Sequence, residues 1–302
     1  MKLVYFTDAH IRGGTPKSRI DDYARALWDK FAQLTSFIQK NKVEAALNGG
    51  DLFDIPDPST GVVNKYIKLF ASWDIPIYSV TGSHDKFAYN DSTISRTALG
   101  TLIASNIVQL IDNTVQLTDK FWVTGVSHSY DLDESPKIDY FKKKPAKGYM
   151  IQLCHGMITE KPYFGKYTLY SQIQTEADLV LTGHYHPGFG PYDVSGSTIL
   201  NIGSMGRVER TERKYDPGFL YIDSNKRTYK FIPFQVQANP FITKTIEDPK
   251  TVVDIQTFIA CLKDKVNTFG QVNLKELILA VGKEKNMPLS IIKRAIEYIE
   301  NE

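Results

Sequence analysis

Five short polar clusters in this 302-residue chain combine carboxylates, imidazoles and glycines, and each directly follows an apolar run. Carboxylates and neutral imidazoles together favour a borderline divalent cation such as Mn²⁺, Fe²⁺ or Zn²⁺ over Mg²⁺ or Ca²⁺ alone. Taken singly, each cluster also fits an ordinary turn, but five of the six histidines fall inside them, which predicts one shared metal site. The clusters are Asp8-Ala9-His10, Gly49-Gly50-Asp51-Leu52-Phe53-Asp54, Gly82-Ser83-His84-Asp85, Cys154-His155-Gly156 and Gly183-His184-Tyr185-His186.

The apolar runs before these clusters are expected to be strands of a layered α/β domain. Residues 3–6, 43–47 and 75–80 are strand candidates, and helical periodicity over 22–40 and 62–70 separates them. This β-α-β-α-β order predicts parallel pairing at the centre of a sheet. Ligands collect at the carboxyl ends of such strands, so we expect the clusters to converge.

After residue 108 the pattern changes to strand candidates joined by short turns, with fewer helices between them. These candidates predict a second sheet packed on the first, in a sandwich with helices outside. Residues 131–147, which include a run of lysines, are predicted to form an exposed loop. The strand candidates are 108–111, 121–126, 149–153, 179–181, 198–202, 219–222 and 228–234.

The composition shifts again near Pro240. Residues 252–266, 274–283 and 289–299 have helical periodicity. We therefore expect a large domain over residues 1–238 and a small α or α+β extension over residues 239–302.

Composition and charge limit the class of protein. The 36 Lys and Arg residues nearly balance the 34 Asp and Glu residues, which neither requires nor excludes a nucleic-acid partner. Cys154 and Cys261 are too few for a disulfide scaffold and fit a reducing compartment. No apolar run reaches the roughly 18–20 residues that span a bilayer. The chain also begins directly in a strand candidate, without a signal peptide, so we expect a cytoplasmic protein with no membrane partner.

Read in order, the clusters resemble the signature of the calcineurin-like metallophosphoesterases: Asp-x-His, Gly-Asp-x-x-Asp, Gly-Asn-His-Asp, His-Gly and Gly-His-x-His. Within that superfamily the chain is similar to the SbcD branch, which includes nuclease subunits of double-strand-break repair complexes. Three features favour this branch: the long first crossover before GGDLFD, the NIGSMGR segment at 201–207, and Asn239-Pro240-Phe241. The resemblance covers about residues 1–235 and implies a four-layer α-β-β-α sandwich.

The resemblance also implies two divalent metal ions, with Mn²⁺ expected first and Mg²⁺, Fe²⁺ or Zn²⁺ as alternatives. Two cations about 3.5–4 Å apart neutralise a phosphodiester and stabilise its attacking and leaving oxygens. His84 is expected to assist the leaving oxygen, oriented by Asp85 or Asp54. The implied ligands are Asp8, His10 and His186 for the first ion, Asp51 as the bridge, and Ser83, His155 and His184 for the second.

One ligand position departs from the family pattern. Ser83 stands where the family has Asn, and a hydroxyl is a shorter and weaker ligand than an amide carbonyl oxygen. We therefore expect the second ion to bind more weakly. The alternative is that Ser83 still ligates through its hydroxyl with a modest loss.

Basic residues outside the clusters are candidates for contact with DNA phosphates. The arginines follow the glycine turn that is expected to border the site, whereas solvated surface charge explains the lysines equally well. His128, the remaining histidine, is expected on a solvent-facing loop. The candidate DNA-binding residues are Arg207, Arg210, Arg213, Lys142, Lys143 and Lys144.

The sequence therefore predicts a metal-dependent DNA exo- or endonuclease that acts with an SbcC-type, SMC-like ATPase, and a homodimer is a further expectation. One alternative is a small-molecule or cyclic-nucleotide phosphodiesterase on the same scaffold. Another is a catalytically impaired subunit that binds DNA ends, because of Ser83. The resemblance implies that residues 239–302 are a reduced capping or partner-docking segment. An apolar stripe over 291–299 either covers its own core or docks on the ATPase.

Overall fold

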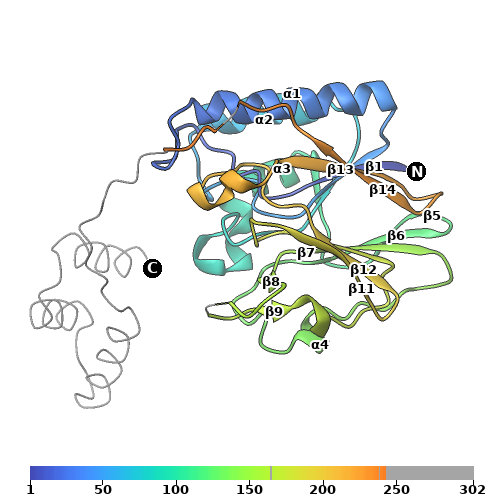
Figure 1. Cartoon of the computed structure of the whole chain (residues 1–302). Helices are drawn as coiled ribbons and strands as arrows, with labels where there is room; N and C mark the ends of the chain where they lie inside the picture. The colour runs from blue at the N-terminus through green and yellow to red at the C-terminus, as the bar shows by residue number, and fades with distance from the viewer. Residues whose placement is uncertain (164, 238, 243–302) are drawn as a thin grey trace, which may run out of the picture. The chain divides into compact units, whose positions relative to one another are not determined.

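Two six-stranded sheets form the centre of the computed structural model, which describes residues 1–163, 165–237 and 239–242 (Figure 1). In the first sheet, β1 to β4 run parallel, as the β-α-β-α-β pattern predicts, and β13 and β14 extend it antiparallel. Its order is β14 (Thr228–Pro233), β13 (Gly218–Asp223), β1 (Lys2–Phe6), β2 (Ala45–Asn48), β3 (Ile77–Ser79) and β4 (Val108–Leu110).

The second sheet is also mixed, with a parallel centre and antiparallel edges. Three of its four middle strands are buried along their whole length, whereas the two edge strands are half exposed. Its order is β11 (Phe189–Val194), β12 (Ser197–Asn201), β10 (Leu179–Thr182), β7 (Tyr149–Cys154), β6 (Phe121–Val126) and β5 (Val115–Thr118).

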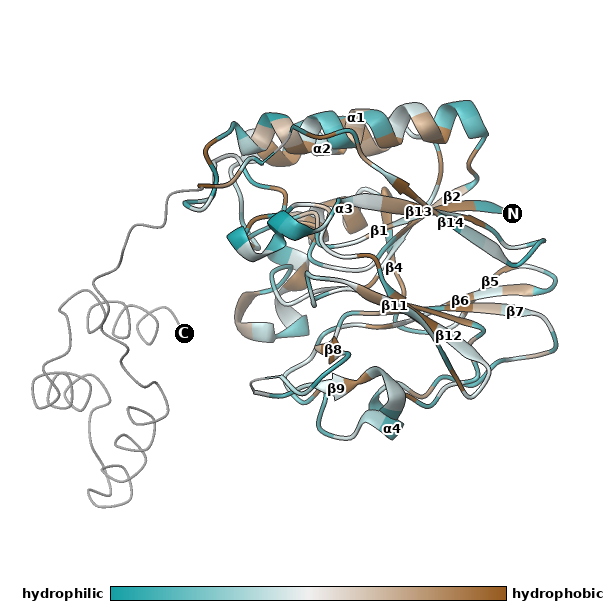
Figure 2. Ribbon diagram, viewed as in Figure 1, coloured by the Kyte–Doolittle hydropathy of each residue, from teal (hydrophilic) through white to brown (hydrophobic). Residues whose placement is uncertain are grey.

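The alternation of side chains along β1 shows how the layers are held together. Leu3 and Tyr5 pack against the second sheet, while Val4 and Phe6 point to the helices on the other face. A strand that is buried on both faces reads as a continuous apolar run, which is why β1 is evident in the sequence. Figure 2 shows the hydrophobic colour concentrated in the strands of both sheets and the hydrophilic colour on the outer surface of the helices.

Helices α1 (Tyr23–Asn41), α2 (Thr60–Ala71) and α3 (Ala98–Ala104) cover the outer face of the first sheet (Figure 1). Helix α1 begins where the carboxylate of Asp22 accepts a hydrogen bond from the backbone N–H of Arg25. Its buried stripe includes Phe31, whose ring meets that of Phe6 edge to face at a centroid distance of 5.8 Å. This layer completes the helix-on-sheet half of the sandwich.

The outer face of the second sheet carries a thinner layer, formed by α4 (Pro136–Asp139) and the ribbon of β8 (Ile158–Thr159) and β9 (Thr168–Leu169). Tyr140 is fully buried here and its hydroxyl donates to Asp133. The prediction of an exposed loop over 131–147 is therefore wrong at Leu132 and Tyr140, which are buried against the sheet, whereas Ile138 and Phe141 are exposed as predicted. The predicted α-β-β-α sandwich is confirmed.

Four short 3-10 helices complete the described secondary structure: η1 (Phe87–Tyr89), η2 (Asp91–Arg96), η3 (Tyr170–Gln172) and η4 (Arg210–Lys214). Residues Met1–Ile242 form one compact unit. The helices predicted at 252–299 lie outside the described residues. Within the described part of the chain, no helix is long and apolar enough to span a membrane.

Candidate metal centre

The five polar clusters of the sequence meet where β1, β2, β3, β7 and β10 end. These strands are parallel within their sheets, and the loops that follow them come together at one edge of the sandwich. Three groups of side chains place one ligand atom each within 4.8 Å of the others in the group. The groups are Asp8, His10 and His186; His10, Asp51 and His84; and Asp51, His155 and His184.

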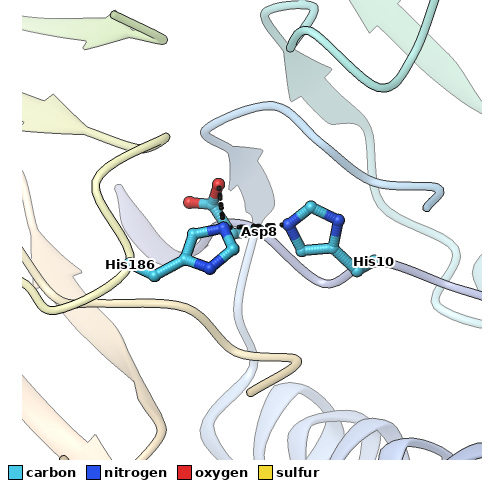
Figure 3. A group of neighbouring side chains, drawn as sticks. All are labelled: Asp8, His10 and His186. Carbon is cyan, nitrogen blue, oxygen red and sulfur yellow. Dashed lines mark hydrogen bonds and ion pairs between the residues drawn. The ribbon is translucent and has the colours of Figure 1, made fainter. Parts of the chain in front are cut away.

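The first group is shown in Figure 3, where the rings of His10 and His186 point toward each other beside the carboxylate of Asp8. Nε2 of His186 lies 3.0 Å from Nε2 of His10 and 3.7 Å from Oδ1 of Asp8. The Asp8 carboxylate is held by the hydroxyl of Thr7 at 2.6 Å and by the backbone N–H of His184 at 3.0 Å. Two imidazole nitrogens and one carboxylate oxygen thus converge on one point.

The third group, Asp51, His155 and His184, is built around Asp51 and His155, both fully buried. Nδ1 of His155 lies 2.7 Å from the carbonyl oxygen of Gly49, and because a carbonyl only accepts, this nitrogen carries a proton. Nε2 of His155 then faces Oδ2 of Asp51 at 3.2 Å. Within the described residues this Nε2 is buried without a hydrogen-bond partner. When the imidazole is neutral, the lone pair of Nε2 faces a lone pair of the carboxylate, and a bound cation would satisfy both atoms.

The electrostatics of this pair also favour a cation. Burial lowers the pKa of His155, but the carboxylate of Asp51 outweighs it and raises the pKa to about 9. Burial alone would raise the pKa of Asp51, yet His155 and His10 hold that pKa well below its usual range. A divalent ion supplies the same positive charge to Asp51 while leaving His155 neutral, so the residues present fit a metal.

Four of these ligand candidates adopt backbone conformations that are unusual for residues with a side chain. Asp8, His10, Asp51 and His184 have φ angles of 51°, 47°, 48° and 70°. The left-handed region costs free energy for residues other than glycine and is found where the surroundings impose it, often at functional sites. Here the strand-end turns aim the four side chains at the shared centre.

Two glycines make room for the ligands. A Cβ atom on Gly82 would lie 1.9 Å from Oδ1 of Asp51, and one on Gly50 would lie 2.3 Å from Nδ1 of His155. Gly50 also has a φ of +98°. The glycines beside the predicted ligands are therefore required by close approach, which only the absence of a side chain allows.

Asp85 braces the loops of the site. Its buried carboxylate accepts hydrogen bonds from the backbone N–H groups of Asp51, Leu52, Phe53 and Gly82, at 2.8–3.3 Å. Burial and the nearby Asp51 raise the pKa of Asp85 to about 6. The contacts of this side chain tie the loop after β2 to the loop after β3.

His84 lies at the exposed edge of the centre. Its Nδ1 is 2.7 Å from the main-chain carbonyl oxygen of Asp54, and its backbone N–H donates to Oδ1 of Asp51 at 2.8 Å. The carboxylate of Asp54 points elsewhere, 2.8 Å from Arg12 and 3.5 Å from Nδ1 of His10. Asp54 thus contacts His84 through its main-chain oxygen, and this contact engages Nδ1 of the ring rather than Nε2.

Ser83 lies beside the third group, Asp51, His155 and His184. Its hydroxyl is 3.4 Å from Oδ2 of Asp51, the same oxygen that faces Nε2 of His155. The side chain is half-buried and is turned toward the centre. Ser83 therefore lies where the family resemblance places a ligand of the second ion, the ion that we expect to bind more weakly.

We predict that Ser83→Asn raises the affinity for the second Mn²⁺ on the order of tenfold, because an amide oxygen reaches farther and is a better neutral ligand. Isothermal titration with Mn²⁺ measures both affinities, and Ser83→Ala is the matched control that removes the hydroxyl. Two tight equivalents in the natural chain, unchanged by Asn, would contradict the prediction.

His128 occupies a different place from the one predicted. It is half-buried, and its ring centroid lies 5.5 Å from that of His184 and 6.4 Å from that of His155. Burial and the neighbouring His155 lower its pKa to about 4, which keeps the ring neutral. The expectation of a solvent-facing loop is wrong, because this loop folds against the metal centre.

Glu212 is a buried residue of the site that the sequence did not indicate. Its Oε1 lies 2.8 Å from Nδ1 of His186. In the sequence Glu212 stands between Thr211 and Arg213 and looks like ordinary surface charge. Only the tertiary contact with His186 distinguishes it.

The architecture and the ligand groups together point to a known family. The profile described as calcineurin-like phosphoesterase matches residues 1–188, more than half of the chain. The chain belongs to the calcineurin-like phosphoesterase family. It is therefore a metal-dependent phosphoesterase, and the family's dinuclear site agrees with the ligand groups that meet here.

Individual relatives of this phosphoesterase include two named DNA double-strand break repair protein Mre11. The one from Sulfolobus acidocaldarius is 25% identical over 300 residues, covering 96% of this chain and 76% of that protein. The one from Saccharolobus solfataricus is 23% identical over 268 residues, covering 85% and 69%. Among solved structures, a dimetal phosphatase from Danio rerio matches with a TM-score of 0.50 and 10% identity, covering 73% and 91%, and shares the fold.

The candidate DNA-binding arginines of this phosphoesterase differ in exposure. Arg207 is buried, and its Nε donates to the main-chain oxygen of Glu212. Arg210 and Arg213 instead line a hollow of about 370 Å³, together with Pro187, Thr211, Lys214 and Tyr215. Because Pro187 follows His186 directly, this cationic hollow begins next to the first ligand group.

The lysine run lies elsewhere. Nζ of Lys144 pairs with Asp178 at 2.7 Å, and Asp178 precedes β10, whereas His184 follows the other end of the same strand. Lys142 is half-buried and Lys143 is exposed. The structure thus does not bring Lys142, Lys143 and Lys144 to the metal centre, and their contact with DNA stays a prediction.

Proposed function

We propose that this phosphoesterase is a nuclease that hydrolyses phosphodiester bonds of DNA in end processing, repair or recombination. The observation that carries the proposal is the cationic hollow at Pro187, Arg210, Arg213 and Lys214, which adjoins His186 and its ligand group. Cationic side chains beside a hydrolytic centre can bind the phosphates of a nucleic acid that extends beyond the scissile bond. The relatives named for DNA double-strand break repair support DNA as the substrate.

We assign the ligands as the resemblance implies, with Mn²⁺ as the proposed metal. When bound, two such ions supply Lewis-acid stabilisation of the phosphate and a nucleophile at neutral pH. Asp8, His10 and His186 would hold the first, and His155, His184 and Ser83 the second. Asp51 would serve both, since it belongs to two of the three ligand groups.

The chain's own contribution to bond cleavage is assigned to His84. Because Nδ1 carries a proton toward the carbonyl oxygen of Asp54, the imidazolium form of His84 would donate its second proton, the one on Nε2, to the leaving oxygen. Asp85 acts indirectly, because its hydrogen bonds fix the backbone of Asp51 and Gly82. The Asp54 carboxylate orients the ring of His10. These two carboxylates are therefore proposed as positioning residues.

We further propose an SbcC-type, SMC-like ATPase as the partner, on the strength of the SbcD-type resemblance, with a segment from about residue 239 onward as its docking region. Of that segment the structure describes 239–242. Phe241 is buried, and the guanidinium groups of Arg19 and Arg207 lie 5.4 and 5.2 Å from the centroid of its ring.

The substrate is tested with a panel of linear duplex DNA, single-stranded DNA and a cyclic nucleotide, each with Mn²⁺. We expect turnover of DNA. Turnover of the cyclic nucleotide without cleavage of either DNA would instead favour the small-molecule phosphodiesterase. DNA binding without cleavage, together with cleavage gained by Ser83→Asn, would favour the impaired end-binding subunit.

We predict that Arg213→Ala weakens DNA binding roughly fivefold, about 1 kcal/mol, and lowers the salt slope of binding by about one, because a phosphate contact is lost. Fluorescence anisotropy at several salt concentrations measures both. Lys40→Ala removes an exposed cation in the last turn of α1, outside every proposed binding surface, and is the matched control. Equal effects of the two substitutions would contradict the hollow as the phosphate site.

A further inference from the structure

We infer that Glu212 is a positioning residue for the first metal ion and acts through His186. Its Oε1 lies 2.8 Å from Nδ1 of His186, while Nε2 of the same ring faces Nε2 of His10 at 3.0 Å and Oδ1 of Asp8 at 3.7 Å. A carboxylate on the far nitrogen of a ligand histidine fixes the tautomer and the orientation of the ring. Here it directs the lone pair of Nε2 to the point where the first ligand group converges.

The carboxylate is built into the fold rather than carried by a surface loop. Glu212 is 1% exposed, and its Oε2 accepts a hydrogen bond from the backbone N–H of Glu209. The guanidinium of Arg207 donates to the main-chain oxygen of Glu212 at 3.1 Å. A buried carboxylate that lacks partners is costly, so the backbone N–H of Glu209 at Oε2 and the imidazole of His186 beside Oε1 explain how its charge is retained inside.

The turn before Glu212 is anchored to the same ligand loop. The hydroxyl of Ser204 donates to the main-chain oxygen of Asp8 and accepts from the backbone N–H of Arg207. The buried ammonium of Lys30 donates to the carbonyl oxygens of Met205 and Gly206, at 2.6 and 3.0 Å. A chain of hydrogen bonds therefore connects the main-chain oxygen of Asp8 through Ser204 and Arg207 to the main-chain oxygen of Glu212. These bonds hold the carboxylate of Glu212 next to the ring of His186.

The placement of Glu212 also separates it from its neighbours on η4. Arg210 and Arg213 are exposed and line the hollow, whereas Glu212 between them points inward to His186. A five-residue element thus presents cations to the surface and one carboxylate to the metal centre. The inference rests on His186 as a metal ligand, as proposed above, and does not require DNA to be the substrate.

The test is the affinity of the full chain for Mn²⁺, measured by isothermal titration and by the electron paramagnetic resonance of the bound ion. We expect Glu212→Gln to weaken the affinity for the first Mn²⁺ ion by about 10–100-fold, which is the range typical when a ligand histidine loses its hydrogen-bond partner. The affinity for the second ion should change by no more than about twofold. Glu209→Gln is the matched control, since it makes the same charge change on the same segment and keeps the backbone N–H.

A double-mutant cycle separates positioning from a general structural role. If Glu212 acts through His186, Glu212→Gln adds no further loss of Mn²⁺ affinity to His186→Ala. Unchanged affinity in Glu212→Gln, or the full loss repeated in the His186→Ala background, would overturn the inference. Because the readout is metal affinity, a failure of the nuclease proposal appears separately, as tight Mn²⁺ binding without DNA cleavage.

Discussion

Asp51→Asn is expected to lower DNA hydrolysis by at least about 10³-fold and to reduce the bound Mn²⁺ from two ions to one or none. Asp51 is fully buried, and it is the residue that links the His10 and His84 group to the His155 and His184 group. An amide of the same size removes the negative charge that both proposed ions share. The loss therefore concerns metal binding and not the packing of the loop.

The fold should survive this substitution, because an Asn oxygen can still accept the hydrogen bond from the backbone N–H of His84. Metal content by mass spectrometry after dialysis and the initial rate of cleavage are the two measurements. Asp57→Asn changes an exposed carboxylate six residues away and is the control. If Asp51→Asn retains two ions and cleaves DNA at the natural rate, the assignment of the bridge is wrong.

His84→Gln is expected to lower kcat for DNA by about 10²–10⁴-fold while both ions remain bound. His84 is at the exposed edge, its Nδ1 is fixed by the carbonyl oxygen of Asp54, and its Nε2 is the nitrogen that we assign to the leaving oxygen. Glutamine fills similar space but cannot donate a proton as an acid. The effect should therefore fall on kcat rather than on Mn²⁺ affinity.

The leaving group provides the decisive comparison for His84. A nitrophenyl phosphodiester releases an anion that is stable without protonation, so the His84→Gln defect should be much smaller on that ester than on DNA. Rates of both enzymes on both substrates measure this. An equal defect on the two substrates would exclude proton donation by His84 and leave it a role in binding.

The centre was predictable from the sequence because its signals are local. Each ligand candidate follows a buried strand within a few residues, as Asp8 and His10 follow β1, and parallel strands deliver such residues to one edge. Glycines also lie next to the ligands, as Gly82 does, where a Cβ atom would collide with the carboxylate of Asp51. The family resemblance then ordered these local signals into ligand groups.

Features that depend on distant contacts could not be predicted in this way. Glu212 is 26 positions from His186, in a charged run with no pattern of its own. Tyr140 is one buried aromatic residue in a polar segment, so periodicity cannot detect it. The edge strand β11 contains Gly190 and Pro191, which weaken any strand pattern, and its pairing with β12 is set by the sheet.

The most direct test is the dependence of DNA cleavage on Mn²⁺, measured as the initial rate on end-labelled linear duplex for the natural chain and Asp51→Asn side by side. We predict no cleavage by the natural chain after chelation, full recovery on adding Mn²⁺, and no recovery in Asp51→Asn. Cleavage that persists after chelation, or that is equal in the two proteins, would contradict a nuclease whose chemistry depends on this metal centre.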